Sequence, residues 1–139
     1  MKRSDPQLGD LTFDSDIGWW EGRVTLPSGS SFVLYVHTPT EKDQSITEAA
    51  RAAFEKMNRS EQAAREFAAA ELLSVHNGEW SEGKEILAGE FTRRLVPATI
   101  QVWPDGDAEI SFEDDNLFWG HEIGVRYRGG RFTEAVVQG

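Results

Sequence analysis

The sequence predicts a single α+β domain over residues 1–139, in which an antiparallel sheet carries its helices on one face. Segments with alternating apolar residues occur near the start of the chain and again in its last third, as expected for strands. The middle of the chain instead has apolar residues at helical spacing. The resulting order of strands, helices and strands favours an antiparallel sheet with a helical layer.

The first part of the chain predicts two hairpin strands after an irregular start. Residues 1–10 are polar, so we expect a frayed start before a short strand at 11–13. Apolar residues alternate in 20–26 and 32–36, and the Pro, Ser and Gly residues of 27–30 separate these two runs. This pattern predicts a hairpin.

The middle of the chain predicts two to three helices. Ser45 and Glu48 have the spacing of a capping box ahead of an apolar face that ends at Met57. Ser60 can cap a second helix, and Asn77-Gly78 is a suitable stop for it. We expect these two helices to form a helical hairpin or one kinked helix.

A shorter helix is expected at 88–95, with Phe91 and Leu95 buried.

The last third predicts a meander whose register follows from one turn. A three-residue loop at 104–106, with Gly106 left-handed, makes three apolar cross-strand pairs: Val102–Ala108, Ile100–Ile110 and Ala98–Phe112. A two-residue loop would oppose Val102 to Glu109, so the longer loop is favoured. The row facing away from the core then contains Trp103, Asp107, Glu109, Ser111 and Glu113.

The final hairpin leaves one residue open to two interpretations. A two-residue turn at Gly129-Gly130 pairs Tyr127 with Phe132 and Ile123 with Val136. Glu134 then falls on the apolar side, opposite Val125. Either a β-bulge alters the register or a polar group is kept there for a role.

Charge and composition exclude several classes of function. The net charge is -10, with 24 acidic against 14 basic residues, which opposes nucleic-acid binding. No apolar run approaches the roughly 18 residues of a membrane span, and no signal segment is evident, so we expect a cytoplasmic protein without a membrane partner. The absence of cysteine excludes disulfides and thiol catalysis.

No Lys or Arg lies between Arg94 and Arg126, and seven acidic residues fill this stretch: Asp105, Asp107, Glu109, Glu113, Asp114, Asp115 and Glu122. This is either a solvated face or a surface that steers a basic partner. An outward Trp103 would add an aromatic anchor, unless a helix or loop covers it. The candidate partner-binding residues are therefore Trp103, Asp107, Glu109, Glu113 and Asp115.

The only catalytic hypothesis that the sequence supports rests on a histidine. His37, His76 and His121 are far apart, and neither metal-ligand spacing nor a nucleotide or nucleophile motif occurs, so we expect no cofactor and no metal. His121 begins a strand on its apolar side, after a turn that contains Asp114. With Asp114 or Glu134 it is a candidate general base; alternatively it bonds the turn or contacts a ligand.

Three segments together resemble a known bacterial family. Trp20-Glu21-Gly22-Arg23-Val24, Pro104-Asp105-Gly106 and the stretch from Asp114 to His121 resemble the family of domain of unknown function 2262. The family pattern has Asp-Gly-Asp where this chain has Asp114-Asp115-Asn116. The resemblance implies an α+β layout and a bacterial cytosolic setting, and it implies no activity.

The leading functional hypothesis is a non-enzymatic protein-binding domain, such as an immunity-type inhibitor of a basic partner. The alternative is a small hydrolase or ligand-binding protein with a pocket around His121 and Trp119. In a third interpretation the stretch from Asp114 to His121 only closes the sheet. The sequence does not determine the oligomeric state.

Overall fold

A computed structural model describes residues 1–40 and 42–139, which form one sheet and a helical layer. The strands are β1 (Lys2–Asp5), β2 (Gly9–Asp14), β3 (Trp19–Thr25), β4 (Ser31–His37), β5 (Val96–Val102), β6 (Ala108–Glu113), β7 (Glu122–Arg128) and β8 (Arg131–Gln138). The helices are α1 (Glu48–Asn58), α2 (Glu61–Val75) and α3 (Ala88–Arg94), with a π-helical turn, η1 (His76–Trp80).

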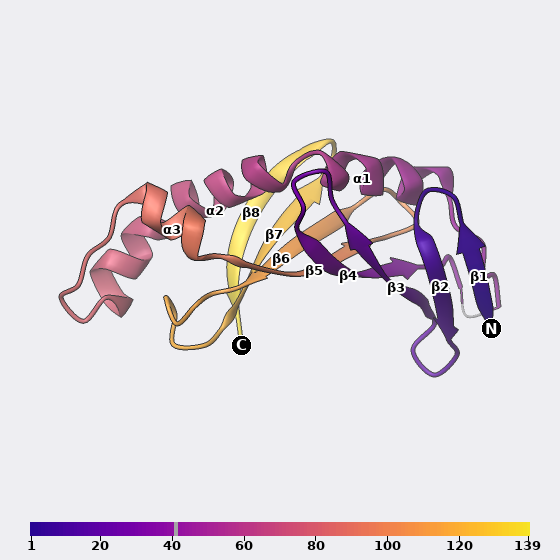
Figure 1. Ribbon diagram of the computed structural model, residues 1–139, viewed down its shortest axis with the longest axis horizontal. Coiled ribbons are helices and arrows are strands. Elements are labelled where there is room, and N and C mark those ends of the chain that lie inside the picture. The colour runs from indigo at the N-terminus through magenta and orange to yellow at the C-terminus, as the bar shows by residue number, and fades with distance from the viewer. Residues whose placement is uncertain (41) are drawn as a thin grey trace.

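The strands lie in the sheet in chain order, from β1 at one edge to β8 at the other. All neighbours are antiparallel except β4 and β5, which run parallel. The sequence predicted an antiparallel sheet, and this one pair differs because the whole helical segment connects β4 to β5. Helices α1 and α2 cross one face of the sheet, and α3 lies beside α2 (Figure 1).

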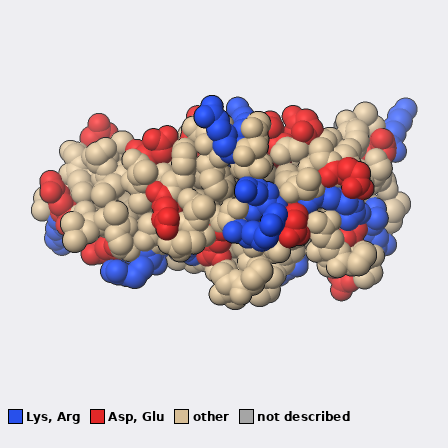
Figure 2. Space-filling model, turned by 90° about the horizontal axis from the view of Figure 1, so that it is seen from above, with Lys and Arg blue, Asp and Glu red and all other residues tan. Residues whose placement is uncertain are grey.

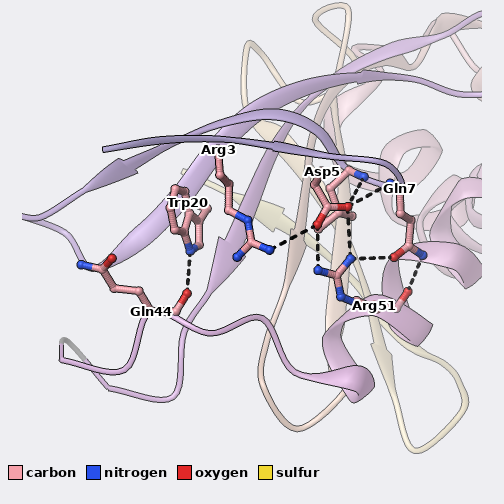
Figure 3. Close-up of polar contacts among 7 residues, drawn as sticks. Arg3, Asp5, Gln7, Trp20, Gln44 and Arg51 are labelled. Atoms are coloured by element: carbon pink, nitrogen blue, oxygen red, sulfur yellow. Dashed lines mark hydrogen bonds and ion pairs between the residues drawn. The ribbon is translucent and has the colours of Figure 1, made fainter.

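The prediction of a frayed start is wrong, since β1 and β2 form a hairpin that is fixed to the helical layer. The Asp5 carboxylate is buried and accepts the backbone N–H groups of Gln7 and Leu8. It also forms an ion pair with Arg51 of α1 (Figure 3). These contacts bury Leu8 in the core.

The three predicted helices are present, but two of their ends differ. The N-cap of α1 is Thr47 rather than Ser45: its hydroxyl accepts the N–H of Ala50 and donates to the Pro104 carbonyl. Gly78 lies inside η1, which follows α2 directly, so it does not stop the helix. The side-chain amide of Asn77 holds this turn by donating to the Ile86 carbonyl and accepting the Ile86 N–H.

The predicted hairpin of β5 and β6 is confirmed except at its far end. Gly106 has φ +96°, and Val102–Ala108 and Ile100–Ile110 are cross-strand pairs. The third pair is wrong, because a register shift between Pro97 and Thr99 places Phe112 opposite Pro97 instead of Ala98. Proline supplies no N–H to the ladder, a common setting for an irregularity.

The bulge interpretation of Glu134 is correct. Tyr127 opposes Phe132 as predicted, but a register shift between Arg126 and Tyr127 places Ile123 opposite Val137 rather than Val136. Glu134 therefore opposes Arg126 on the face away from the helices.

The core lies between the helices and the sheet. Its largest fully buried side chains include Trp20, Phe32, Phe91, Phe112 and Phe118. Seen from the helix side, acidic and basic side chains are interspersed over the surface rather than gathered in one patch (Figure 2). Within the described residues, no helix is long and apolar enough to cross a membrane.

Candidate functional site

The loop between β6 and β7, residues 114–121, is organised by one buried carboxylate, that of Asp114. Its two oxygens accept four backbone N–H groups, from Asn116 at 3.0 Å, Phe118 at 2.8 Å, Gly120 at 3.2 Å and His121 at 3.1 Å. A carboxylate bound in this way draws the loop backbone around itself. Asp114 is thus the structural centre of the loop.

The loop backbone is strained. Asp115, Asn116 and Trp119 have φ of 49°, 62° and 62°, in the left-handed region that residues with a Cβ seldom adopt. Each such residue costs on the order of 1 kcal/mol. Arg94 adds a second anchor, because its guanidinium donates to both the carbonyl and the carboxylate of Asp115.

The catalytic candidates are not assembled into one site. The His121 ring donates from Nδ1 to the Phe118 carbonyl at 2.7 Å, which leaves Nε2 as an acceptor in the neutral ring. Asp114 contacts the backbone N–H of His121 and not its imidazole. Glu134 lies on β8, where it forms an ion pair with Arg126 at 2.8 Å.

Trp119 is exposed at the tip of the loop, with 59% of its surface accessible. Its indole packs edge-on against Trp80 at 4.7 Å and donates to the Trp80 carbonyl at 3.3 Å. Trp80 also contacts the rings of Phe118 and His121. Sequence reasoning missed Trp80, because only the π-helical turn after α2 brings it to a loop 39 residues away.

A polar hollow of ≈ 400 Å³ lies beside this loop and is lined by Glu113, Asp114, Asp115, Asn116, Gly120, His121 and Glu122. Glu113 and Glu122 are directly opposite each other on β6 and β7. Neither forms an ion pair with any residue that the structure describes. Like charges in directly opposed positions destabilise a sheet.

The other predicted partner-binding acids are neutralised by the chain itself. Three arginines lie beside them: Arg128 at 3.9 Å from Asp107, Arg126 at 3.3 Å from Glu109, and Arg94 at 3.0 Å from Asp115. The acidic stretch of the sequence is therefore not a uniformly negative surface.

Two members of the predicted outward row are also less accessible than expected. Glu109 is buried because Gln138 crosses over Gly124 to donate to its carboxylate at 3.0 Å. Trp103 is half-buried and stacks face to face on His37, with ring centroids 4.6 Å apart. The stacking contact on Trp103 comes from His37 of the neighbouring strand β4, and not from a helix or loop as the alternative prediction had it.

Among residues 1–40 and 42–139, no group of three or more His, Cys, Asp or Glu side chains is placed to hold a metal ion.

The fold and the loop define an α+β domain whose distinctive element is a strained, carboxylate-centred connection between β6 and β7. The chain belongs to the bacterial family described as "Uncharacterized protein conserved in bacteria (DUF2262)", whose model matches residues 5–135. This confirms the resemblance seen in the sequence. No curated protein and no solved structure matches the chain.

Proposed function

We propose that the protein is a cytoplasmic protein-binding domain that docks a basic partner at the loop end of its sheet. The docking surface, here called the loop surface, consists of Trp119, Glu113 and Glu122. One observation carries the proposal: a tryptophan is held exposed on a left-handed backbone that Asp114 and Arg94 stabilise. Large exposed aromatic side chains on a rigid support are the usual anchors of protein interfaces.

The unpaired charges on the strand ends that flank the loop indicate the chemistry of the partner. Glu113 and Glu122 repel each other, and no cation among the described residues relieves this repulsion. A lysine or arginine from a partner would remove the repulsion on binding. The net charge of -10 would also accelerate the approach of a basic protein, most strongly at low ionic strength.

An immunity-type inhibitor of a basic toxin is one form that such a domain takes. In this form the domain binds its partner in a fixed ratio and blocks it, without chemistry of its own. A hydrolase built on His121 has less support, because Asp114 is committed to backbone N–H groups and Glu134 to Arg126.

The proposal is tested by purifying the tagged protein from the bacterium that encodes it, identifying what copurifies, and measuring affinity with the purified partner. Trp119→Ala and Glu122→Lys should each weaken binding by at least about tenfold. Glu71→Lys, an equal charge change at an exposed position of α2, should leave it nearly unchanged.

Two results would refute the proposal. One is a partner whose affinity is the same for wild type, Trp119→Ala and Glu122→Lys. The other is equal weakening by Glu122→Lys and Glu71→Lys, since that would reflect net charge alone rather than the loop surface.

A further inference from the structure

A second hollow, of ≈ 290 Å³, lies at the opposite end of β6 from Glu113, on the face of the sheet away from the helices. Its lining combines one indole with side chains of both charges: Trp103, Asp107, Glu109, Arg126 and Arg128, with Asp105 and Ala108 at the turn. This feature, here called the Trp103 hollow, takes no part in the loop surface.

The indole of Trp103 is fixed in place by its neighbours. His37 stacks on it with an interplanar angle of 7°, and the His37 ring is held by a 3.0 Å hydrogen bond between Nε2 and the Gln101 side chain. Trp19 packs edge-on against His37, and it packs in a tilted arrangement against Tyr35. One face of the Trp103 indole is thus covered by His37, and the same indole lines the hollow.

The polar lining has unused hydrogen-bonding capacity. Nε of Arg128 is 3.9 Å from the Asp107 carboxylate, too far for a hydrogen bond, and both side chains are partly exposed. Arg126 Nε lies 3.3 Å from Glu109 and Nη1 2.8 Å from Glu134, so Arg126 is more firmly held. A hydroxyl group placed between Asp107 and Arg128 can donate to the first and accept from the second.

The hollow carries charges of both signs, which disfavours ionic ligands. Asp105, Asp107 and Glu109 lie beside Arg126 and Arg128, and the Asp105 carboxylate at the rim also accepts the N–H of Asp107. An anion would meet the carboxylates and a cation the guanidiniums. An apolar ligand would displace water from these charged groups without replacing its hydrogen bonds, at a cost in free energy. A neutral ligand rich in hydroxyls, with one apolar face, meets none of these penalties.

We propose that the Trp103 hollow binds a saccharide ring. The apolar C–H face of the sugar stacks on the indole of Trp103, and adjacent hydroxyls bridge Asp107 and Arg128. The volume of the hollow lies close to the lower end, about 300 Å³, of ordinary small-molecule pockets, which suits one sugar ring. The ring is neutral, so binding does not depend on the net charge of the protein.

The test uses the full chain and a panel of neutral sugars: glucose, galactose, mannose, N-acetylglucosamine, ribose, maltose and cellobiose. Saturation-transfer NMR identifies binders, and titration calorimetry measures their affinity. At least one sugar should bind with a Kd no weaker than about 10 mM. Trp103→Ala and Arg128→Gln should each weaken the binding of that sugar at least about fivefold. Trp119→Ala should leave its affinity unchanged.

Arg128 is largely exposed, so Arg128→Gln tests the site even if Trp103→Ala fails to fold. The proposal is overturned if no sugar of the panel binds the wild-type protein. It is equally overturned if a sugar binds with unchanged affinity to Arg128→Gln and to a folded Trp103 variant. Raising the salt concentration should leave sugar binding unchanged, whereas it should weaken the binding of a basic partner at the loop surface.

Discussion

The Asp5 carboxylate and the Arg51 guanidinium form a bidentate ion pair that connects the N-terminal hairpin to α1. Arg51 Nη2 lies 2.7 Å from Asp5 Oδ2, and Nη1 lies 3.1 Å from Oδ1 (Figure 3). Gln7 extends the network, because its side-chain oxygen accepts from Arg51 and its amide donates to the Arg51 carbonyl. The hairpin thus owes its position to a contact between residues 46 positions apart.

Asp5→Asn should destabilise the protein by about 3 kcal/mol, because it leaves Arg51 without its buried partner. The hydrogen bonds from Arg51 lower the pKa of Asp5 against the opposing effect of burial. The ionised form is therefore the one that stabilises the fold, and this contribution, present above the ordinary value of 3.8, is lost as pH falls further.

Urea unfolding at pH 7 and at pH 3 measures both effects. Arg3→Gln is the control, since Arg3 lies 3.7 Å from Asp5 and is partly exposed; it should cost less than about 1 kcal/mol. A similar loss of stability in Asp5→Asn and Arg3→Gln would contradict the conclusion that the ion pair with Arg51 fixes the hairpin.

Asp114→Ala should cost about 3 kcal/mol, since several N–H groups of the loop lose a charged acceptor. Hydrogen exchange at the amides of Phe118, Gly120 and His121 should accelerate in this variant. Asp115→Ala removes a carboxylate that accepts no N–H group of the loop and keeps the bond from Arg94 to the residue 115 carbonyl, so it should accelerate these amides less than Asp114→Ala does. Unchanged exchange in Asp114→Ala would mean that the carboxylate does not organise the loop.

Gly22→Ala should cost about 2 kcal/mol, because β2 crosses closely over this position. A Cβ atom at residue 22 would lie 2.7 Å from the Asp10 carbonyl oxygen and 2.9 Å from a methyl group of Leu11. Gly78→Ala is the control: a Cβ there meets no atom within 4 Å, and the substitution should be neutral or stabilise by about 0.5 kcal/mol. Thermal unfolding of both variants would settle the comparison, and equal melting temperatures would count against it.

Glu122→Gln should stabilise the protein by about 0.5 kcal/mol at low salt by ending the repulsion from Glu113. The gain should shrink as salt is added. Glu71→Gln, on the exposed face of α2, provides the baseline for losing one negative charge. If both variants gain the same stability, the repulsion between Glu113 and Glu122 does not destabilise the sheet.

His37 should titrate below its ordinary pKa of 6.5, because burial beside Trp103 lowers the pKa more than the bond to Gln101 raises it. The unfolded chain then takes up a proton before the folded one, so stability should fall as pH drops below about 6.5. NMR titration of the imidazole gives the pKa, and His37→Gln should remove this part of the pH dependence. An imidazole pKa at or above 6.5 would be inconsistent with the packing.

Several features of the fold could be predicted because local patterns determine them. The loop at 104–106 follows from its Gly106 and from the apolar pairs Val102–Ala108 and Ile100–Ile110 on either side. The helical spacing of apolar residues likewise located α1, α2 and α3. Both the periodicity of apolar residues and the residue preferences of turns depend only on residues that are close together in the sequence.

Other features could not be predicted, since they depend on contacts across the fold. The bulge between Pro97 and Thr99 changes the partner of Phe112, and the bulge at Arg126 carries Glu134 to the other face. Thr47 rather than Ser45 caps α1 because its hydroxyl also reaches the Pro104 carbonyl, 57 positions away.

The sequence by itself determined the succession of strands, helices and strands apart from β1, the net negative charge and the family to which the chain belongs. The tertiary structure alone decided which carboxylates remain unpaired. Arg94 reaches Asp115 and Arg126 reaches Glu109 from other elements, whereas Glu113 and Glu122 are left facing each other. The charge of a surface depends on which distant side chains the fold brings within a few ångströms, and composition does not contain that information.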